Sequence, residues 1–388
     1  MNEAIFKNEI QEYIKSIENF NAFVFHLKKS PFENISSKEL SQQIQGRQIA
    51  KNKIPFLLSI KNYYYPTHLN LEQASSEFTA IYKQSLGLGE SFLDLTGGMG
   101  IDTYFIGKNF KSITYVEKNQ ELFEISKHNL NVLFQDKNLD FINTSAEYFI
   151  ENNKKHFDLI YIDPSRRING SRKFLLEELE PNIISLKDDM LKVSNKILIK
   201  LSSLFDIKEC IKKIDNVTEI HIISYKNEVK ELLIILENTT NPNPKIIAID
   251  LFYNQQFQYN YIDEEMAIKP NYSLSEKYIY IPNNSLLKAG CFKLISFQFQ
   301  LNKLHPNTHI YSSNNLIDDF FGRIFEIVEY NIDKKKLIGI KANVISKNYP
   351  LDTNEIKKKY KIVDGGDAYY FFIKAEEKYQ ILKCIRIK

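Results

Sequence analysis

The sequence has little cysteine and no long apolar run. Its 388 residues include three cysteines, Cys210, Cys291 and Cys384, which lie far apart and lack the spacing of a metal site. Neither a disulfide framework nor a zinc site is therefore predicted. No apolar stretch approaches the roughly 18 residues of a membrane span, and the N-terminus lacks a basic start followed by an apolar segment. We expect a cytoplasmic protein with no membrane segment and no metal.

The sequence also lacks a large excess of either charge, with 51 basic and 48 acidic side chains. Their distribution is uneven, because residues 322–388 contain 15 basic and nine acidic residues. The lysine runs 334–336 and 357–359 in this segment are typical either of a solvated face or of a surface that binds phosphates and stacks bases. The rings considered for stacking are Tyr311, Tyr330, Tyr349, Tyr360, Tyr369 and Tyr370.

The most informative stretch is residues 92–103, Phe-Leu-Asp-Leu-Thr-Gly-Gly-Met-Gly-Ile-Asp-Thr. An apolar run that ends in an acid and three glycines predicts a buried strand turning sharply into a helix, with room for a ligand at the turn. Two later apolar runs also end in acids, at Glu117 and Asp163. Ligands of open α/β sheets bind outside the carboxyl ends of the strands, so Asp94, Glu117 and Asp163 predict a site for a hydroxyl-rich, partly cationic small molecule.

Two other glycine motifs fit less well. A dinucleotide fingerprint would use Gly98, Gly100 and Thr103, and threonine is too large for the last position, which disfavours NAD. A phosphate loop requires lysine and a hydroxyl residue after the glycines, whereas Ile101 and Asp102 follow Gly100, which disfavours ATP. What remains resembles the signature of class I S-adenosylmethionine (SAM) methyltransferases. A nucleotide site and a purely structural turn stay as alternatives.

The pattern of elements predicts an α/β fold with a Rossmann-like, seven-stranded sheet. From Phe92 onward strands and helices alternate, which predicts a parallel sheet covered by helices on both faces. One of these helices is expected at about 172–193. The runs 219–224 and 231–236 are joined by a segment too short for a crossover helix, so they form an antiparallel hairpin. A parallel sheet that ends in one such hairpin is typical of class I methyltransferases. An α-helical region precedes the sheet and α+β modules follow it.

Asp94 and Glu117 are expected to contact the cofactor. Asp94 is a candidate for contact through water or with the methionine amine, although it could simply cap the following helix. Glu117 lies 23 residues further on, about the spacing of an acid that binds both ribose hydroxyls. Asn143 to Ala146 end the third strand, where an adenine amino group would be bound, although Ser145 is equally a plain helix N-cap.

The segment Asp163-Pro164-Ser165-Arg166-Arg167 lies where the methyl group and its acceptor should meet. The proline stiffens the turn, so that the Asp163 carboxylate faces the cleft. The two arginines offer fork-shaped donors suited to phosphate or carboxylate. Alternatively, they pair with Asp102, Asp163 or the Glu177 and Glu178 region.

The chain resembles bacterial class I SAM methyltransferases that carry a ferredoxin-like module and a C-terminal THUMP-like domain. The motifs that carry this resemblance are Gln73-Ala74-Ser75-Ser76-Glu77-Phe78-Thr79-Ala80, the glycine turn, Asp163 to Arg167, Lys303-Leu304-His305-Pro306-Asn307-Thr308-His309, Lys341 to Val344 and Asp364-Gly365-Gly366-Asp367. The resemblance implies that Gln73 to Glu77 close over the methionine end of SAM. THUMP-type domains bind RNA in other proteins, so it also implies an RNA substrate, a structured rRNA or tRNA.

Domain boundaries follow from composition and from this resemblance. Residues 238–244 contain no apolar side chain and two prolines, which predicts a boundary there. The expected domains are a helical region (1–70), a SAM-dependent methyltransferase domain (71–240), a ferredoxin-like module (245–321) and a THUMP-like domain (322–388). Strand-like runs are expected at 246–253 and 292–299, and a helix at 314–321.

The expected site residues fall into three groups. Those expected to bind SAM are Gln73, Ser75, Ser76, Asp94, Thr96, Gly97, Gly98, Gly100, Asp102, Glu117, Lys118, Ser145, Ala146 and Asp163. Those expected to act in catalysis are Asp163, Pro164 and Arg166. Candidates for RNA contact are Arg166, Arg167, Lys357, Lys358 and Lys359.

The sequence departs from enzymes that methylate exocyclic base amines, which carry a second proline and an aromatic residue after the acid-proline pair. Ser165 and Arg166 occupy these positions, although Arg166 could stack on a base instead. No cysteine falls at a strand end, which disfavours cysteine-assisted methylation. His305 and His309 are interrupted by Pro306, so a structural turn is favoured over a metal site. We predict an RNA methyltransferase; the alternatives are a SAM-binding RNA-binding or assembly factor with little turnover and a methyltransferase of proteins or small molecules.

Overall fold

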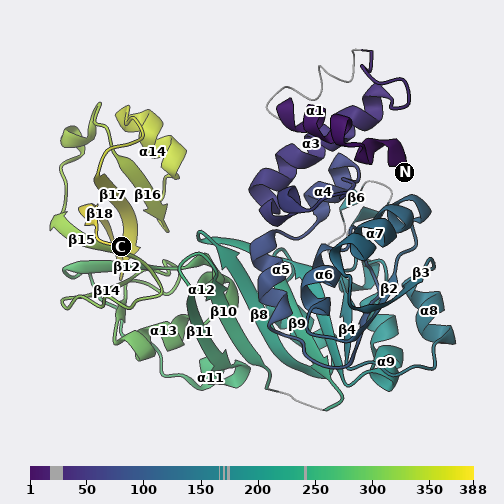
Figure 1. Cartoon of the computed structure of the whole chain (residues 1–388). Helices are drawn as coiled ribbons and strands as arrows, with labels where there is room; N and C mark the ends of the chain where they lie inside the picture. The colour runs from purple at the N-terminus through teal and green to yellow at the C-terminus, as the bar shows by residue number, and fades with distance from the viewer. Residues whose placement is uncertain (18–28, 166, 169–170, 173–174, 240–242) are drawn as a thin grey trace. The chain divides into compact units, whose positions relative to one another are not determined.

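The computed structural model describes residues 1–17, 29–165, 167–168, 171–172, 175–239 and 243–388. The chain divides into two compact units (Figure 1). The first comprises residues 1–218 and 233–241, and the second comprises residues 219–232 and 242–388. None of the helices in the described ranges is long and apolar enough to cross a membrane.

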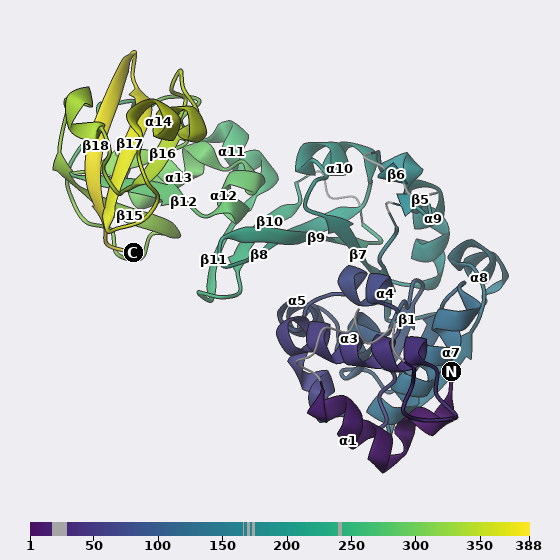
Figure 2. The same cartoon turned by 90° about the horizontal axis from the view of Figure 1, so that it is seen from above.

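The first unit begins with short helices, as the sequence predicts. Ser36 and Glu39 form a capping box that fixes the start of α3, because each side chain accepts a hydrogen bond from the other residue's N–H. Ala50 of α3 and the following Leu57 pack with Met99 of the glycine turn. Figure 2 shows α3 between α1 and α4. Their bounds are η1 Glu3–Phe6, α1 Asn8–Ser16, α3 Ser37–Lys53, η2 Pro55–Ser59, α4 His68–Gln73 and α5 Glu77–Gln84.

Five parallel strands form the centre of the first unit. They are hydrogen-bonded in the order β7-β4-β1-β2-β3, and Asp94 at the end of β1 lies between Tyr161 of β4 and Tyr115 of β2. The strands are β1 Ser91–Asp94, β2 Ser112–Val116, β3 Asn138–Ile142, β4 Leu159–Ile162 and β7 Lys196–Ser202. The helices between and after them are α6 Ile101–Gly107, α7 Gln120–Leu133, α8 Ala146–Asn152, α9 Ile183–Val193 and α10 Ile207–Lys213.

The sheet continues through the predicted hairpin and then gains two strands. The hairpin is β8 Val217–Tyr225 and β9 Glu228–Glu237, and the full order is β11-β10-β8-β9-β7-β4-β1-β2-β3. The predicted class I order is thus present, and the fold class is confirmed. The run expected at 246–253 is β10 Lys245–Asp250, which pairs in parallel with β8, and β11 Gln255–Asn260 pairs with β10. The sheet therefore has nine strands rather than seven.

The helix expected at about 172–193 is wrong over its first half. The structure has the short strand pair β5 Arg167–Ile168 and β6 Ser171–Arg172, then η3 Leu176–Glu178, and α9 begins only at Ile183. Pro181 explains the late start, because the residue before a proline avoids the helical region. Asn182 then caps α9 through hydrogen bonds from the N–H groups of Ile184 and Ser185.

The second unit contains a seven-stranded sheet with the order β13-β14-β12-β15-β18-β17-β16. Its core is built from fully buried side chains such as Ile279, Phe325, Phe371 and Leu382. The strands are β12 Tyr278–Pro282, β13 Asn302–Lys303, β14 Tyr311–Ser313, β15 Gly322–Glu329, β16 Asn343–Lys347, β17 Ala368–Ala375 and β18 Lys378–Arg386. The helices are α11 Tyr261–Met266, α12 Asn284–Ala289, α13 Phe292–Phe299, η4 Lys334–Leu337 and α14 Thr353–Tyr360.

Two expectations for this unit are wrong. Residues 292–299 form the helix α13 rather than a strand, although their apolar, aromatic-rich composition favours a strand. The segment 314–321 is not helical. There the Tyr280 hydroxyl donates to the carbonyl of Asn315 and accepts from the N–H of Ile317, so a side chain from β12 satisfies backbone groups that a helix would have paired internally.

Candidate functional site at the strand ends

The three glycines form the sharp turn between β1 and α6. Gly98 and Gly100 have φ values of +54° and +80°, which glycine adopts without strain. A Cβ on Gly97 would lie 2.0 Å from the Tyr115 ring, so this glycine permits close packing on β2. A Cβ on Gly98 would meet nothing nearer than 3.8 Å, so the space above Gly98 is open. The turn therefore has one packed side and one side that can receive a ligand.

Glu117 lies directly against this turn, as predicted for an acid at the next strand end. One carboxylate oxygen accepts from the N–H of Gly98 at 3.0 Å, and the other accepts from the N–H of Asn119 at 2.8 Å. The Asn143 side chain donates to the Glu117 carbonyl at 2.7 Å. Each carboxylate oxygen retains acceptor capacity after these bonds, so the group can still bind hydroxyls.

Asp94 is 1 % exposed and both of its carboxylate oxygens are used within the protein. One accepts from the N–H of Thr96 at 3.0 Å and the other from the Thr103 hydroxyl at 2.6 Å. Burial, and to a smaller degree the nearby acids Asp102 and Asp163, raise the pKa of Asp94 to about 7. This geometry favours the structural alternative, in which Asp94 holds the turn to α6.

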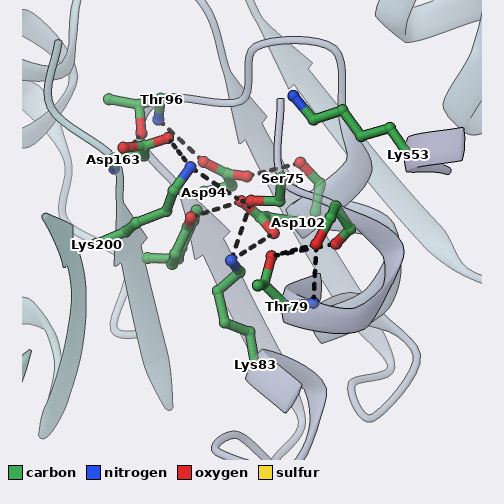
Figure 3. Close-up of polar contacts among 12 residues, drawn as sticks. Lys53, Ser75, Thr79, Lys83, Asp94, Thr96, Asp102, Asp163 and Lys200 are labelled. Carbon is green, nitrogen blue, oxygen red and sulfur yellow. Dashed lines mark hydrogen bonds and ion pairs between the residues drawn. The ribbon is translucent and has the colours of Figure 1, made fainter. Parts of the chain in front are cut away.

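Asp102 is the centre of a polar network (Figure 3). Its side chain is 11 % exposed and accepts from the hydroxyls of Ser75 at 2.6 Å and Tyr161 at 2.7 Å. The Lys83 ammonium, which is completely buried, lies 3.2 Å from the other carboxylate oxygen. Burial alone would raise the pKa of Asp102, but Lys83 and Lys200 outweigh it and the pKa is lowered. Asp102 therefore stays ionised inside the protein.

Lys200 connects this network to Asp163. Its ammonium donates to the Asp163 carboxylate at 2.6 Å and lies 3.8 Å from Asp102 (Figure 3). The N–H of Asp163 donates to the Thr96 hydroxyl at 2.7 Å, which ties the end of β4 to the glycine turn. The Asp163 side chain is 35 % exposed, so it is the acid of this network that solvent or a ligand can reach.

The other predicted site residues are partly dispersed. Ser76 and Ser145 cap α5 and α8, Ala146 and Pro164 are buried, and Lys118 pairs with Glu180 at the surface. Gln73 is exposed and lines a shallow pocket of about 600 Å³ between α3 and α4. Arg166 lies outside the described residues, and only the backbone of Arg167, in β5, is described.

Fewer of the lysine and tyrosine side chains expected to contact RNA are free at the surface of the second unit than the sequence predicts. Lys357 forms an ion pair with Asp364 at 2.6 Å, while Lys358 and Lys359 are exposed. Most of the tyrosines expected to stack are not available as an exposed set. Tyr311, Tyr360 and Tyr370 are less than a tenth exposed because they pack in the cores around β14, α14 and β17, so the prediction that they stack on bases is wrong.

Sequence reasoning missed Lys83 and Lys200. Lys200 stands within the apolar run 197–201, where a charged residue in a buried strand signals a specific partner. Lys83 follows Thr79 by four residues, on the buried face of α5. Both signals were present, but neither identifies the partner.

In the second unit, His305 accepts from the N–H of Asn307 and from Asn348, and no cluster of three or more metal-ligating side chains occurs in the described ranges.

The chain matches three protein families along its length. Residues 66–247 match a family described as conserved hypothetical protein 95, residues 278–320 match a ferredoxin-like domain, and residues 322–385 match a THUMP-like domain. These matches follow the order that the sequence motifs predict, so the resemblance is confirmed. The exact domain boundaries remain a prediction.

Two similar proteins give context for these matches. A crystal structure of a methyltransferase candidate from Porphyromonas gingivalis W83 is 28 % identical, with a TM-score of 0.89 over 100 % of both chains. A Mycoplasma mobile protein described as an uncharacterised RNA methyltransferase is 31 % identical over 173 residues. That match covers 42 % of each protein, so the chain spans less than half of this relative.

The raised pKa of Asp94 predicts a pH-dependent stability. The folded pKa of about 7 lies above the unfolded value of about 4, so folding favours the protonated acid. The contribution of Asp94 to the free energy of unfolding is complete below about pH 4 and is lost as the pH rises towards 7. Relative to Asp94→Asn, the wild type should lose stability between pH 5 and 7 by up to about 1.4 kcal/mol per pH unit in urea unfolding.

Asp158→Asn is the control for this measurement. Hydrogen bonds from Ser91, foremost its backbone N–H, lower the pKa of Asp158, so its contribution is lost only in acid and should be constant between pH 5 and 7. A wild type whose stability relative to Asp94→Asn does not change over this range would contradict the raised pKa.

Lys83→Met should lower the free energy of unfolding by about 3 kcal/mol, because it removes the nearest cation from a largely buried carboxylate. Adding Asp102→Asn should recover part of this loss, since the uncompensated charge is then absent. Lys111→Met is the matched control, because Lys111 pairs with Glu90 at the surface and its loss should change stability by less than about 1 kcal/mol. Equal effects of Lys83→Met and Lys111→Met on the free energy of unfolding in urea would show that the buried Lys83–Asp102 pair stabilises the fold no more than a surface pair does.

Proposed function

We propose that this chain, which has the class I methyltransferase fold followed by a ferredoxin-like and a THUMP-like domain, is a SAM-dependent methyltransferase that acts on RNA in the cytoplasm. The observation that carries the proposal is that Glu117, the glycine turn and Asp163 meet at the carboxyl ends of the neighbouring strands β1, β2 and β4. Ligands of open parallel sheets bind at this edge.

The residues of the turn fit SAM. The open space above Gly98 admits a ligand to the backbone, and Glu117 beside it has acceptor capacity for two ribose hydroxyls. Ser75, in the middle of the segment expected to close over the methionine end, is fixed by its bonds to Asp102 and Lys83. SAM, when bound, supplies a methyl group already activated by its sulfonium.

The protein then has to hold an acceptor in line with this methyl group. Asp163 is suited to that role because it is partly exposed and fixed at two points, by Thr96 through its backbone and by Lys200 through its carboxylate. We assign to Asp163 the orientation of the acceptor and the acceptance of its proton. Pro164 restricts the backbone that follows, and Arg166 and Arg167 are proposed to contact the substrate.

The proposal of an RNA substrate rests on three points. The THUMP-like match covers residues 322–385, the same segment carries the excess of basic side chains, and the Mycoplasma mobile relative is described as an RNA methyltransferase. Lys358 and Lys359 are exposed on α14 and can contact phosphates.

A second candidate is a SAM-binding RNA-binding factor with little turnover. The Asp163–Lys200 ion pair favours it, because the carboxylate that would accept a proton already has a cation at 2.6 Å. Turnover requires the acceptor to enter between or beside these two groups. Measured turnover therefore separates the two candidates.

Glu117→Ala should weaken binding of SAM and of S-adenosylhomocysteine by about 1 to 3 kcal/mol, the usual effect of removing a charged hydrogen-bond acceptor. Isothermal titration calorimetry measures this, and NAD should not compete. Glu121→Ala, an exposed acid in the first turn of α7, is the matched control and should bind normally. Unchanged SAM affinity in Glu117→Ala would remove Glu117 from the cofactor site.

Asp163→Asn should keep SAM affinity within a few-fold and lower turnover by roughly 10² or more, as expected for a positioned acid or base. The assay uses methyl transfer from labelled SAM to RNA from a strain that lacks the protein, with mass spectrometry of the nucleosides. Asp158→Asn, at the amino-terminal side of β4, should retain turnover. Equal losses of binding and rate would make Asp163 a cofactor ligand, and no transfer by the wild type would favour the binding factor.

A further inference from the structure

An exposed aromatic cluster, distinct from the lysine runs of the THUMP-like segment, lies on two neighbouring turns of the second unit. Tyr225 ends β8 and Lys226 follows it in the β8–β9 turn, and the β10–β11 turn contributes Phe252 and Tyr253. Phe252 packs perpendicular to Tyr225 at 5.5 Å and to Tyr253 at 4.9 Å, measured between ring centroids. Phe252 is 47 % exposed and Tyr253 is 53 % exposed. We call these four residues the aromatic platform.

The platform is held by one completely buried acid, Asp250. One carboxylate oxygen accepts from the N–H groups of Phe252 at 2.9 Å and Tyr253 at 3.3 Å. The other accepts from the N–H of Asn227 at 3.0 Å, from the Asn283 amide at 2.7 Å and from Ser224. Because one carboxylate binds the backbone of both turns, the two turns that carry the rings are held together before any ligand arrives.

The β8–β9 turn is further fixed and places a lysine at the rings. Lys226 and Asn227 have φ values of +52° and +66°, a conformation that glycine would adopt at lower cost. Asn284 donates to both the side chain and the backbone carbonyl of Asn227, at 2.8 and 2.7 Å. The Lys226 ammonium lies 4.9 Å from the centre of the Phe252 ring and 5.7 Å from that of Tyr225. The platform therefore presents a positive charge over aromatic rings.

We propose that the aromatic platform binds an unpaired segment of RNA, with a base stacked on Tyr253 and a phosphate paired with Lys226. Phe252 supports both groups, since it contacts the Tyr253 ring and lies under the Lys226 ammonium. Bases stack on aromatic side chains irrespective of sequence, and an adjacent ammonium neutralises the backbone. This inference rests on the proposed RNA methyltransferase function and identifies a single-stranded part of the substrate.

Charge and preorganisation favour RNA over an apolar protein partner. A ligand that stacks on the rings must also accommodate the Lys226 ammonium, and a nucleotide supplies a flat π face and an anion within one residue. Rings that are carried on held turns and packed against one another lose less conformational freedom on binding than free side chains would, which favours stacking.

The test measures binding of the full chain to short single-stranded RNA by fluorescence anisotropy. Tyr253→Ala should weaken binding by roughly tenfold to a hundredfold, the effect of one lost stacking contact. Lys226→Ala should flatten the slope of log affinity against log salt by about 0.7, the value for one phosphate contact on a single strand. Phe297→Ala is the matched control, since Phe297 of α13 is 71 % exposed and lies outside the platform.

Tyr253→Trp provides a positive test, because the chain contains no tryptophan. This variant should bind RNA with wild-type affinity or better, and its single tryptophan should be quenched when a base stacks on it. Double-stranded RNA of the same sequence should not quench the tryptophan fluorescence and should not bind through the platform.

The outcomes separate this inference from the proposed function. Wild-type RNA affinity in both Tyr253→Ala and Lys226→Ala, together with Asp163-dependent methylation of RNA, would overturn the platform and leave the methyltransferase intact. Absence of RNA binding by the wild type overturns both the platform and the RNA substrate. Normal SAM binding in every platform variant is expected, because no platform residue belongs to the glycine turn.

Discussion

The ionised, largely buried carboxylate of Asp102 is the constraint on which the candidate site depends. Removing a carboxylate from water costs several kcal/mol unless cations and hydrogen-bond donors replace the water. The chain supplies them from elements far apart in the sequence, with Lys83 from α5, Tyr161 from β4 and Lys200 from β7. Satisfying one acid therefore fixes a helix and two strands around the glycine turn.

Lys200 connects the buried Asp102 to the partly exposed Asp163. The same ammonium contacts Asp102 and Asp163, so the position of the partly exposed acid depends on the buried one. Thr96 fixes the backbone of Asp163 from the side of the turn. The acid that we assign to the acceptor is thus held by charge from one side and by a neutral hydrogen bond from the other, which limits its freedom without burying it.

The sequence predicts well what depends on local order along the chain. The glycine turn, the acid at the end of β2 and the hairpin β8–β9 follow from spacing and alternation, and the structure brings Gly98 and Glu117 together. The sequence predicts poorly those features that depend on contacts between residues far apart in the chain. Lys83 is a partner of Asp102 only because α5 packs on α6, and residues 292–299 form a helix despite a composition that favours a strand. The role of Asp94 was open for the same reason, since its burial cannot be seen in the motif.

Asp102 and Asp250 solve the same problem with different partners, and the difference suits what each supports. Asp250 accepts from N–H groups, an amide and a hydroxyl, which fix two turns in place, and its hydrogen-bond donors among the described residues are neutral. Asp102 is neutralised by two lysines, one of which also serves Asp163. Neutral hydrogen-bond donors to Asp250 are sufficient to hold the two turns that carry the aromatic platform. Where a second carboxylate lies beside the first, a shared cation offsets the repulsion between the two acids, as Lys200 does for Asp102 and Asp163.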